Sequence, residues 1–335
     1  MRNLCFLAGL TAFAAAAQAE ATKYPLTLQN CGFDVTFDEA PAATVSLGQA
    51  ATEILYSLDL ADKVAGTGVW FSDVLPQFAE VNAKVERLAD NDPSFESIVA
   101  KRPNVVIAQY EWHVGPQGIV GTREQFEDLG IATYVLPTDC VGKDNTVGGD
   151  GTRLEPFTTD VLYQTIAELG QIFDVQDKAT ALVADLRARE AAAKEKVAAM
   201  QIDDISAVFW FSSPELDLDP YVAGQKGAPG YIMSTLGITN VVQSDEEWPT
   251  VGWETIARAN PTLIVAAEMT RRRFEADDIE KKEAFLAADP VASQMEAAKN
   301  GRIASMTSDS MEPGIRVIGG IEQLADALAS YGLAN

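Results

Sequence analysis

The longest helical pattern in the chain runs from Pro156 to Met200. Its first half repeats apolar residues at steps of four, three and four, the spacing of one helical face: Leu162, Ile166, Leu169 and Phe173. Asp174 opens a second run, which ends in an Ala- and charge-rich stretch without an apolar stripe. We interpret residues 157–200 as a helix, kinked near 174–177, that leaves one core and bridges to another. The alternative is a surface helix of one large domain.

Strand and helix patterns alternate on both sides of this connecting helix. Before it, a hairpin-like alternation is followed by apolar strands separated by helices: 24–37, 44–47, 63–68, 104–109 and 132–136. After it, strands again alternate with helices: 207–211, 240–243, 262–267 and 302–306. Because this order is typical of parallel sheets, we predict an α/β fold of two Rossmann-like lobes with central parallel sheets, over 20–156 and 201–335. A Gly- and Asp-rich stretch, 139–155, is expected to be a plain loop.

One local pattern occurs in both lobes. Residues 96–108 and 254–266 share E-[ST]-I-x4-P-x-[VL]-[IV]-[IV]-A without a gap. Each copy predicts a helix, a proline that ends it and a buried strand. Asp92 is expected to cap the first helix, with Pro93 at its first position. The equal spacing on either side of the connecting helix indicates two similar lobes.

The N-terminus has the pattern of an export signal. Arg2 supplies a positive charge, residues 4–17 are a short apolar run, and Ala17-Gln18-Ala19 is a cleavage signal. We therefore predict a signal peptide over residues 1–19, cleaved after Ala19, and a periplasmic location if the cell has two membranes. Beyond it, the sequence contains no run of eighteen apolar residues that could span a membrane.

Cysteine, histidine and charge narrow the possible functions. Cys31 and Cys140 remain after cleavage, and an even pair in an oxidising compartment predicts a disulfide, with two free thiols as the alternative. The single histidine, His113, argues against metal centres built from several histidines, so no protein-made metal site is expected. The net charge of -24 argues against nucleic acid and anionic lipid as partners.

Candidate binding chemistry follows the predicted strands. In an open parallel sheet, ligands bind beyond the carboxyl ends of the strands, and aromatic and Arg side chains gather there. The expected ligand-binding residues are Gln49, Trp70, Phe71, Tyr110, Trp112, His113, Ser212, Arg271, Arg272, Arg273, Glu312 and Arg316. The three consecutive Arg residues suggest an anionic ligand; a solvated charge run is the alternative. His113 could contact a ligand or its metal, or be a satisfied loop residue. Trp210 lies within a strand and is expected in the core.

These features together resemble the class III periplasmic binding proteins, which deliver iron–siderophores, haem or cobalamin to ABC importers. The resemblance spans the mature chain and is carried by the connecting helix and by four other segments: 24–37, 45–58, 96–108 and 230–237. It implies a rigid connecting helix, a shallow cleft and little closure on binding. The chain departs from the family's S-P-S-A-T-E in reading G-Q-A-A-T-E over 48–53, so that Gln49 replaces a small residue near the cleft.

The resemblance also implies the function. We expect a binding protein, not an enzyme, that captures an iron(III)–siderophore chelate between its lobes and delivers it to the permease dimer of an ABC transporter. Haem and cobalamin are the alternative ligands. We expect a monomer with no intrinsic cofactor. In the family, a Glu on each lobe docks onto Arg residues of the permease; by position in the motif, these are Glu96 and Glu254.

Two other classes of protein are less consistent with the sequence. An exported α/β enzyme would need a nucleophile and a base, and His113 lies near no G-x-S-x-G motif. A binding protein for an unchelated metal would need several converging His or carboxylate ligands, and the chain offers one His.

Overall fold

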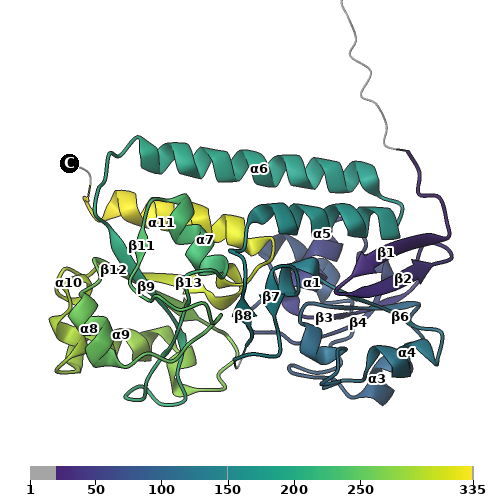
Figure 1. Cartoon of the computed structure of the whole chain (residues 1–335), viewed down its shortest axis with the longest axis horizontal. Helices are drawn as coiled ribbons and strands as arrows, with labels where there is room; N and C mark the ends of the chain where they lie inside the picture. Colours follow the sequence, from purple (N-terminus) through teal and green to yellow (C-terminus); the bar gives the residue numbers. More distant parts are fainter. Residues whose placement is uncertain (1–19, 149, 334–335) are drawn as a thin grey trace, which may run out of the picture.

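The computed structural model describes residues 20–148 and 150–333, which fold into two α/β lobes crossed by a helical layer (Figure 1). The predicted fold class is confirmed. The expected signal peptide, 1–19, lies outside the described residues. Within the described part of the chain, no helix is both long enough and apolar enough to cross a membrane.

The N-terminal lobe is built on a four-stranded parallel sheet in the order β4-β3-β5-β6. Its strands are β3 (Thr44–Leu47), β4 (Val64–Gly68), β5 (Val105–Ala108) and β6 (Ala132–Val135), and its helices are α1 (Gln49–Ser57), α2 (Ala79–Asn82), α3 (Phe95–Val99) and α4 (Arg123–Glu127). Every residue of β3 and β5 is buried, as expected for central strands of a parallel sheet covered on both faces. The predicted hairpin is present as the antiparallel pair β1 (Leu26–Asn30) and β2 (Phe33–Phe37).

The C-terminal lobe has a five-stranded sheet in the order β10-β9-β12-β13, with β11 also paired to β9. Only β10 is antiparallel. The strands are β9 (Ser206–Ser212), β10 (Tyr221–Val222), β11 (Thr239–Asn240), β12 (Leu263–Glu268) and β13 (Ile303–Thr307). The helices are α7 (Ala228–Thr235), α8 (Trp253–Ala259), α9 (Ile279–Ala288), α10 (Glu296–Lys299) and α11 (Arg316–Ser330).

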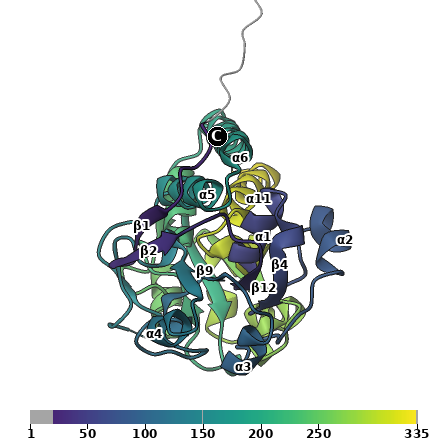
Figure 2. The same cartoon turned by 90° about the vertical axis from the view of Figure 1, so that its right-hand side faces the viewer.

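The connecting segment consists of two helices, α5 (Thr159–Ile172) and α6 (Gln176–Ala198), which meet at Asp174 in a left-handed conformation (φ 56°). Figures 1 and 2 show α6 lying along α5 and α11, and it contacts both helices. The weak apolar stripe of α6 was interpreted as a sign that the helix crosses solvent between two separate cores. Instead, α6 packs on α5 and α11 along its length. Its buried face carries mainly small or aliphatic residues, including Ala179, Leu186 and Ala193, which allow close packing on the helices below.

A single apolar cluster runs through both lobes. It joins residues of the N-terminal lobe, such as Ile54, to Leu169 of α5 and Leu186 of α6, and continues to Ile232 and Leu324 in the C-terminal lobe. The helical layer is thus part of a core that the lobes share.

Residues 139–155, which we call the strap, contain structure that we did not predict. The plain-loop prediction was wrong, because β7 (Lys143–Asp144) and β8 (Thr152–Arg153) pair as a short hairpin. The strap also bonds to the other lobe: Arg153 N–H donates to the Asp245 carbonyl at 2.9 Å, and Glu247 N–H donates to the Gly151 carbonyl at 3.0 Å. In Figure 1 this hairpin lies between the lobes.

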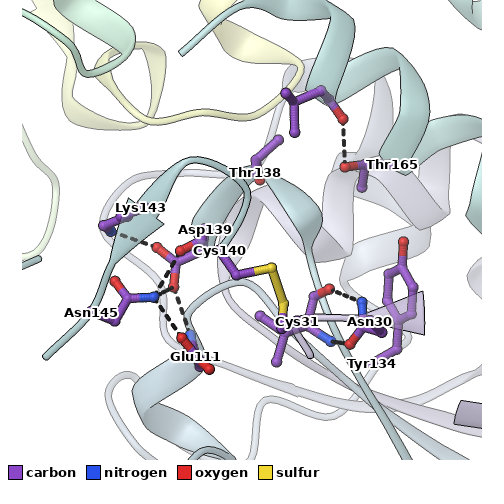
Figure 3. The surroundings of a disulfide bond; sticks show 12 residues. Asn30, Cys31, Glu111, Tyr134, Thr138, Asp139, Cys140, Lys143, Asn145 and Thr165 are labelled. Atoms are coloured by element: carbon purple, nitrogen blue, oxygen red, sulfur yellow. Dashed lines mark hydrogen bonds and ion pairs between the residues drawn. A yellow bond between two sulfur atoms is a disulfide. The ribbon is translucent and has the colours of Figure 1, made fainter. Parts of the chain in front are cut away.

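The predicted disulfide is present. Cys31, at the turn between β1 and β2, is bonded to Cys140 in the strap, with Cα atoms 5.6 Å apart (Figure 3). The bond therefore anchors the start of the strap to the edge of the N-terminal lobe, where the Asn30 side chain also bonds the backbone of Val135 in β6.

The duplicated motif adopts matching structures in the two lobes. Glu96 and Glu254 are each the second residue of their helices, α3 and α8, and both are exposed. The residue before each proline, Arg102 or Asn260, is left-handed, with φ of 49° and 51°. One detail of the prediction was wrong: the cap of α3 is Ser94, whose hydroxyl accepts the Ser97 N–H, because the Asp92 carboxylate is bound to His113 instead.

Candidate ligand site between the lobes

A cavity of about 420 Å³ lies between the lobes, within the size range of small-molecule sites. Segments that follow strands β4, β5 and β6 line it from one lobe. From the other lobe it is lined by the end of β9, by β10 and by segments that follow β11, β12 and β13. The lining residues are Phe71, Tyr110, Trp112, Asp139, Lys143, Asp150, Phe211, Ser212, Tyr221, Glu247, Trp248, Met269, Arg271, Arg273, Phe274, Asp277, Glu312 and Pro313. The cavity therefore lies where parallel sheets commonly bind ligands.

Flat aromatic faces from both lobes form much of the cavity wall. Tyr110 and Trp112, just after β5, stack with their ring centroids 4.4 Å apart and their planes 6° apart. On the other lobe, the ring of Phe211 lies 4.6 Å from that of Trp248. Such rings provide large rigid contact surfaces for a bulky ligand.

The three consecutive Arg residues have different environments. The Arg271 guanidinium lies 4.2 Å from the ring centroid of Phe71, and its backbone N–H donates to the Phe71 carbonyl at 3.0 Å, so this contact joins the lobes at the cavity. Arg272 donates to two carbonyl oxygens of its own loop. Arg273 lies over the ring of Phe274. Only Arg271 and Arg273 line the cavity.

Asp277 organises the loop that carries these Arg residues. It is 1% exposed, and its carboxylate accepts hydrogen bonds from the Ser212 hydroxyl at 2.6 Å and from the backbone N–H groups of Arg273 and Phe274 at 2.8 and 2.9 Å. Buried carboxylates require such partners. The loop after β12 is therefore fixed to the end of β9.

The strap contributes paired charges to another wall of the cavity, beside Glu247. Lys143 lies 2.7 Å from Asp139, and Arg153 lies 2.7 Å from Glu247 of the C-terminal lobe. Asp139 also accepts the Glu111 backbone N–H at 2.7 Å (Figure 3). All four charged side chains are nearly inaccessible to solvent, which makes these pairs fixed parts of the wall.

Glu312 and Tyr110 bring polar groups to the same wall, and neither side chain has a hydrogen-bond partner among the residues that the structure describes. Glu312 is 7% exposed and Tyr110 is 6% exposed, and both line the cavity. Burial, reinforced by the nearby charge of Glu247, raises the pKa of Glu312 well above its usual value. Burial and the charge of Glu312 raise the pKa of the Tyr110 hydroxyl well above its usual value as well.

Gln49 and Arg316 act behind the cavity wall. The Gln49 side-chain oxygen accepts the backbone N–H groups of Phe71 and Ser72 at 3.3 and 3.2 Å, and so positions the Phe71 turn. Arg316 forms a buried two-pronged ion pair with Glu53, which links α11 of the C-terminal lobe to α1 of the N-terminal lobe. Neither side chain lines the cavity.

Trp70 and His113 also lie outside the cavity lining. Trp70 is 2% exposed, and its indole N–H donates to the Thr67 hydroxyl. His113 is 1% exposed, and its Nε2 lies 2.9 Å from the Asp92 carboxylate. Its ring is 5.7 Å from that of Trp112, so His113 supports the aromatic wall from behind. Trp210 is fully buried, as predicted for the core.

The structure thus brings together part of the expected set. The expected residues that line the cavity are Phe71, Tyr110, Trp112, Ser212, Arg271, Arg273 and Glu312, and those that do not are Gln49, Trp70, His113, Arg272 and Arg316. Lining residues that were not expected include Asp139, Lys143, Asp150, Phe211, Tyr221, Glu247, Met269, Phe274 and Asp277. The position of Asp139 soon after a predicted strand was the one signal that could have identified the strap side.

Comparisons with known proteins agree with this architecture. A profile of the family described as periplasmic binding protein matches residues 44–310. The chain is 26% identical to an uncharacterized ABC transporter substrate-binding lipoprotein, YvrC, from Bacillus subtilis, over 91% of this chain and 86% of the relative. It is similar to a solved periplasmic binding protein from Veillonella parvula, with 22% identity over 91% of this chain and 97% of that one and a TM-score of 0.76. It is also similar to a solved ABC-type Fe³⁺-hydroxamate transport system from Saccharomonospora viridis, with 26% identity, 91% and 99% coverage and a TM-score of 0.72.

Proposed function

This chain belongs to the periplasmic binding protein family, and from that premise we propose that it captures a ferric hydroxamate siderophore chelate between its lobes. It then delivers the chelate to the permease of an ABC importer. The observation that carries the proposal is the cavity itself, in which stacked aromatic rings and a few fixed polar groups from both lobes surround a space suited to a small organic ligand.

Two observations support a chelate as the ligand. Among the described residues, no three His, Cys, Asp or Glu side chains converge in a way that could hold a metal ion, so iron would arrive with its own chelator. The similar protein from Saccharomonospora viridis is described as a transport system for Fe³⁺-hydroxamate. Haem and cobalamin are the competing ligands, and direct binding measurements distinguish them.

Tryptophan fluorescence provides the test. Trp112 and Trp248 line the cavity, whereas Trp70, Trp210 and Trp253 are buried. A ferric trihydroxamate should therefore quench the wild-type protein at micromolar concentration or below, and Trp112→Phe/Trp248→Phe should lose most of this quenching. Haemin and cyanocobalamin are titrated in parallel. Tighter binding of either one would replace the proposed ligand, and no response to any of the three would refute the proposal.

We further propose that Glu96 and Glu254 dock on the permease. Both are exposed at the second position of matching helices, and no ion pair involving either one is found among residues 20–148 and 150–333. Figure 1 shows α3 and α8 at opposite ends of the molecule, on the side away from α6. Two separated carboxylates on one side suit a partner with two basic sites, such as a permease dimer.

A further inference from the structure

One wall of the cavity carries more acid than base. Its carboxyl groups come from Asp139, Asp150, Glu247 and Glu312. Lys143 is paired with Asp139 at 2.7 Å, and Arg153 with Glu247 at 2.7 Å. Within the described parts of the chain, no cation lies at ion-pair distance from Glu312 or Asp150. The wall therefore has two carboxyl groups in excess of its cations.

Glu312 is the central member of this wall. Its side chain faces the cavity, is 7% exposed, and accepts no hydrogen bond from any residue that the structure describes. The hydroxyl of Tyr110, which is 6% exposed, has no hydrogen-bond partner among the same residues. Both side chains line the cavity, so their free oxygens open onto it. A ligand bound there can supply the hydrogen-bond partner that the protein does not.

A positively charged partner suits this wall, because the carboxyl groups outnumber the cations paired with them. Burial raises the pKa of Glu312, the charges of Glu247, Asp150 and Asp309 raise it further, and the charge of Lys143 opposes the shift. A cation in the cavity would offset both this repulsion and the loss of solvent. The alternative, that Arg271 to Arg273 select an anion, is weaker at this wall. Arg272 is bonded to its own loop, and the guanidinium groups of Arg271 and Arg273 lie over the rings of Phe71 and Phe274.

We propose that the cavity selects a positively charged hydroxamate chelate, whose protonated amine is bound by Glu312, Asp150 and the Tyr110 hydroxyl. An ammonium group has three N–H donors, which match these three acceptors. The aromatic rings of Trp112, Phe211 and Trp248 would then contact the body of the chelate. This inference rests on the proposed function and narrows its ligand class.

Two probes that share one chelate test the inference. Ferrioxamine B carries a free terminal ammonium, and its N-acetyl derivative is the same ferric trihydroxamate without the charge. Because a charge-assisted hydrogen bond is worth roughly 1.5–3 kcal/mol, the wild-type protein should bind the cationic probe about tenfold or more tightly than the neutral one. Tryptophan quenching measures both affinities.

Variants then assign the preference to the wall. Glu312→Gln should reduce the preference to within about twofold, chiefly through weaker binding of the cationic probe. Glu246→Gln removes the same charge from an exposed neighbour outside the cavity lining and should keep the preference. Tyr110→Phe retains the ring stacked on Trp112 and should reduce the preference by a smaller factor, so the assignment stands even if Glu312→Gln fails to fold.

The outcomes separate this inference from the proposed function. If both probes bind the wild-type protein equally, or the neutral probe binds more tightly, the inference is wrong and the proposed function stands. If neither probe binds, the proposed function is wrong and the inference falls with it. A wild-type preference that Glu312→Gln and Tyr110→Phe both leave unchanged would also overturn the assignment.

Discussion

Several ionisable side chains are buried beneath the cavity, where the lobes meet. Glu53 and Arg316 satisfy each other as a two-pronged ion pair. Asp309 is less well satisfied, since its Oδ2 has no hydrogen-bond partner within the described chain. Burial raises the pKa of Asp309 to about 6, although the charge of Arg316 opposes the shift.

Asp309 should therefore reduce stability at neutral pH. Its pKa is about 6 in the folded protein and near 3.8 when unfolded, so the stability contributed by its protonated form is present below pH 4 and is lost as pH rises through 6. Asp309→Asn should raise the free energy of unfolding at pH 8 by up to roughly 3 kcal/mol. Urea unfolding at pH 8 and pH 4 checks this, because the gain should vanish at the lower pH. An equal effect at both would refute the explanation.

Lys282 offers a second prediction at this scale. Its fully buried ammonium donates to the carbonyls of Phe211 and Ala267 at 2.6 Å each, near the strand ends that carry the cavity. Lys282→Met would leave these carbonyls without a donor, and should lower the free energy of unfolding by about 3 kcal/mol. Lys281→Met, at the exposed neighbour, is the control. Both variants are unfolded with denaturant. If their unfolding curves coincide, the prediction is wrong.

The sequence predicted which loops line the cavity better than which side chains do. Phe71 and Tyr110 follow buried strands and line the cavity between the lobes. Gln49 and Arg316 lie at comparable positions, but their long polar side chains are used for backbone and ion-pair contacts between elements. Strand-end position identifies the loop, whereas side-chain direction depends on tertiary partners that are distant in sequence.

At the scale of elements, the strap is the part that sequence patterns missed. Its Gly and Asp residues are typical of an irregular loop, and two-residue strands such as β7 and β8 leave no periodic signal. What orders the strap is long-range: the disulfide to Cys31 at one end and the Arg153–Glu247 ion pair at the other. By contrast, longer elements such as α5, β9 and β12 were predicted because each has an apolar run or an apolar period.

The disulfide should stabilise the fold and the cavity together. Cys31→Ser/Cys140→Ser should lower the free energy of unfolding by about 2–5 kcal/mol, because the bond closes a long loop in the unfolded chain. Asp139, next to Cys140, should also become less well fixed. Guanidinium unfolding of the variant is compared with the wild type under reducing and oxidising conditions. The variant should be insensitive to reductant, and a wild type that is equally insensitive would contradict the role given to this bond.

At the scale of the whole molecule, the proposed docking of Glu96 and Glu254 on a permease predicts the effect of reversing their charges. Glu96→Lys/Glu254→Lys should abolish stimulation of the transporter ATPase in proteoliposomes, because reversed charges repel a basic docking surface. The affinity for the ferric chelate should not change.

A matched control is available in the same chain. Glu124 of α4 and Glu280 of α9 are also exposed acids at the second position of their helices, one in each lobe. Glu124→Lys/Glu280→Lys introduces the same charge change and should leave transport intact. If this control is equally damaging, the effect is one of total charge, and docking at Glu96 and Glu254 would be refuted.

We expect that neither lobe of this protein folds on its own. The apolar cluster passes from the N-terminal lobe through α5 and α6 into the C-terminal lobe, and Phe157 and Tyr231 pack across the same boundary, with ring centroids 5.8 Å apart. A gene fragment that ends before α5 would encode a lobe with its apolar face open to water, and would yield aggregate rather than a soluble half-protein. A chimaera that exchanges lobes between relatives must therefore take α5, α6 and α11 from the same parent protein.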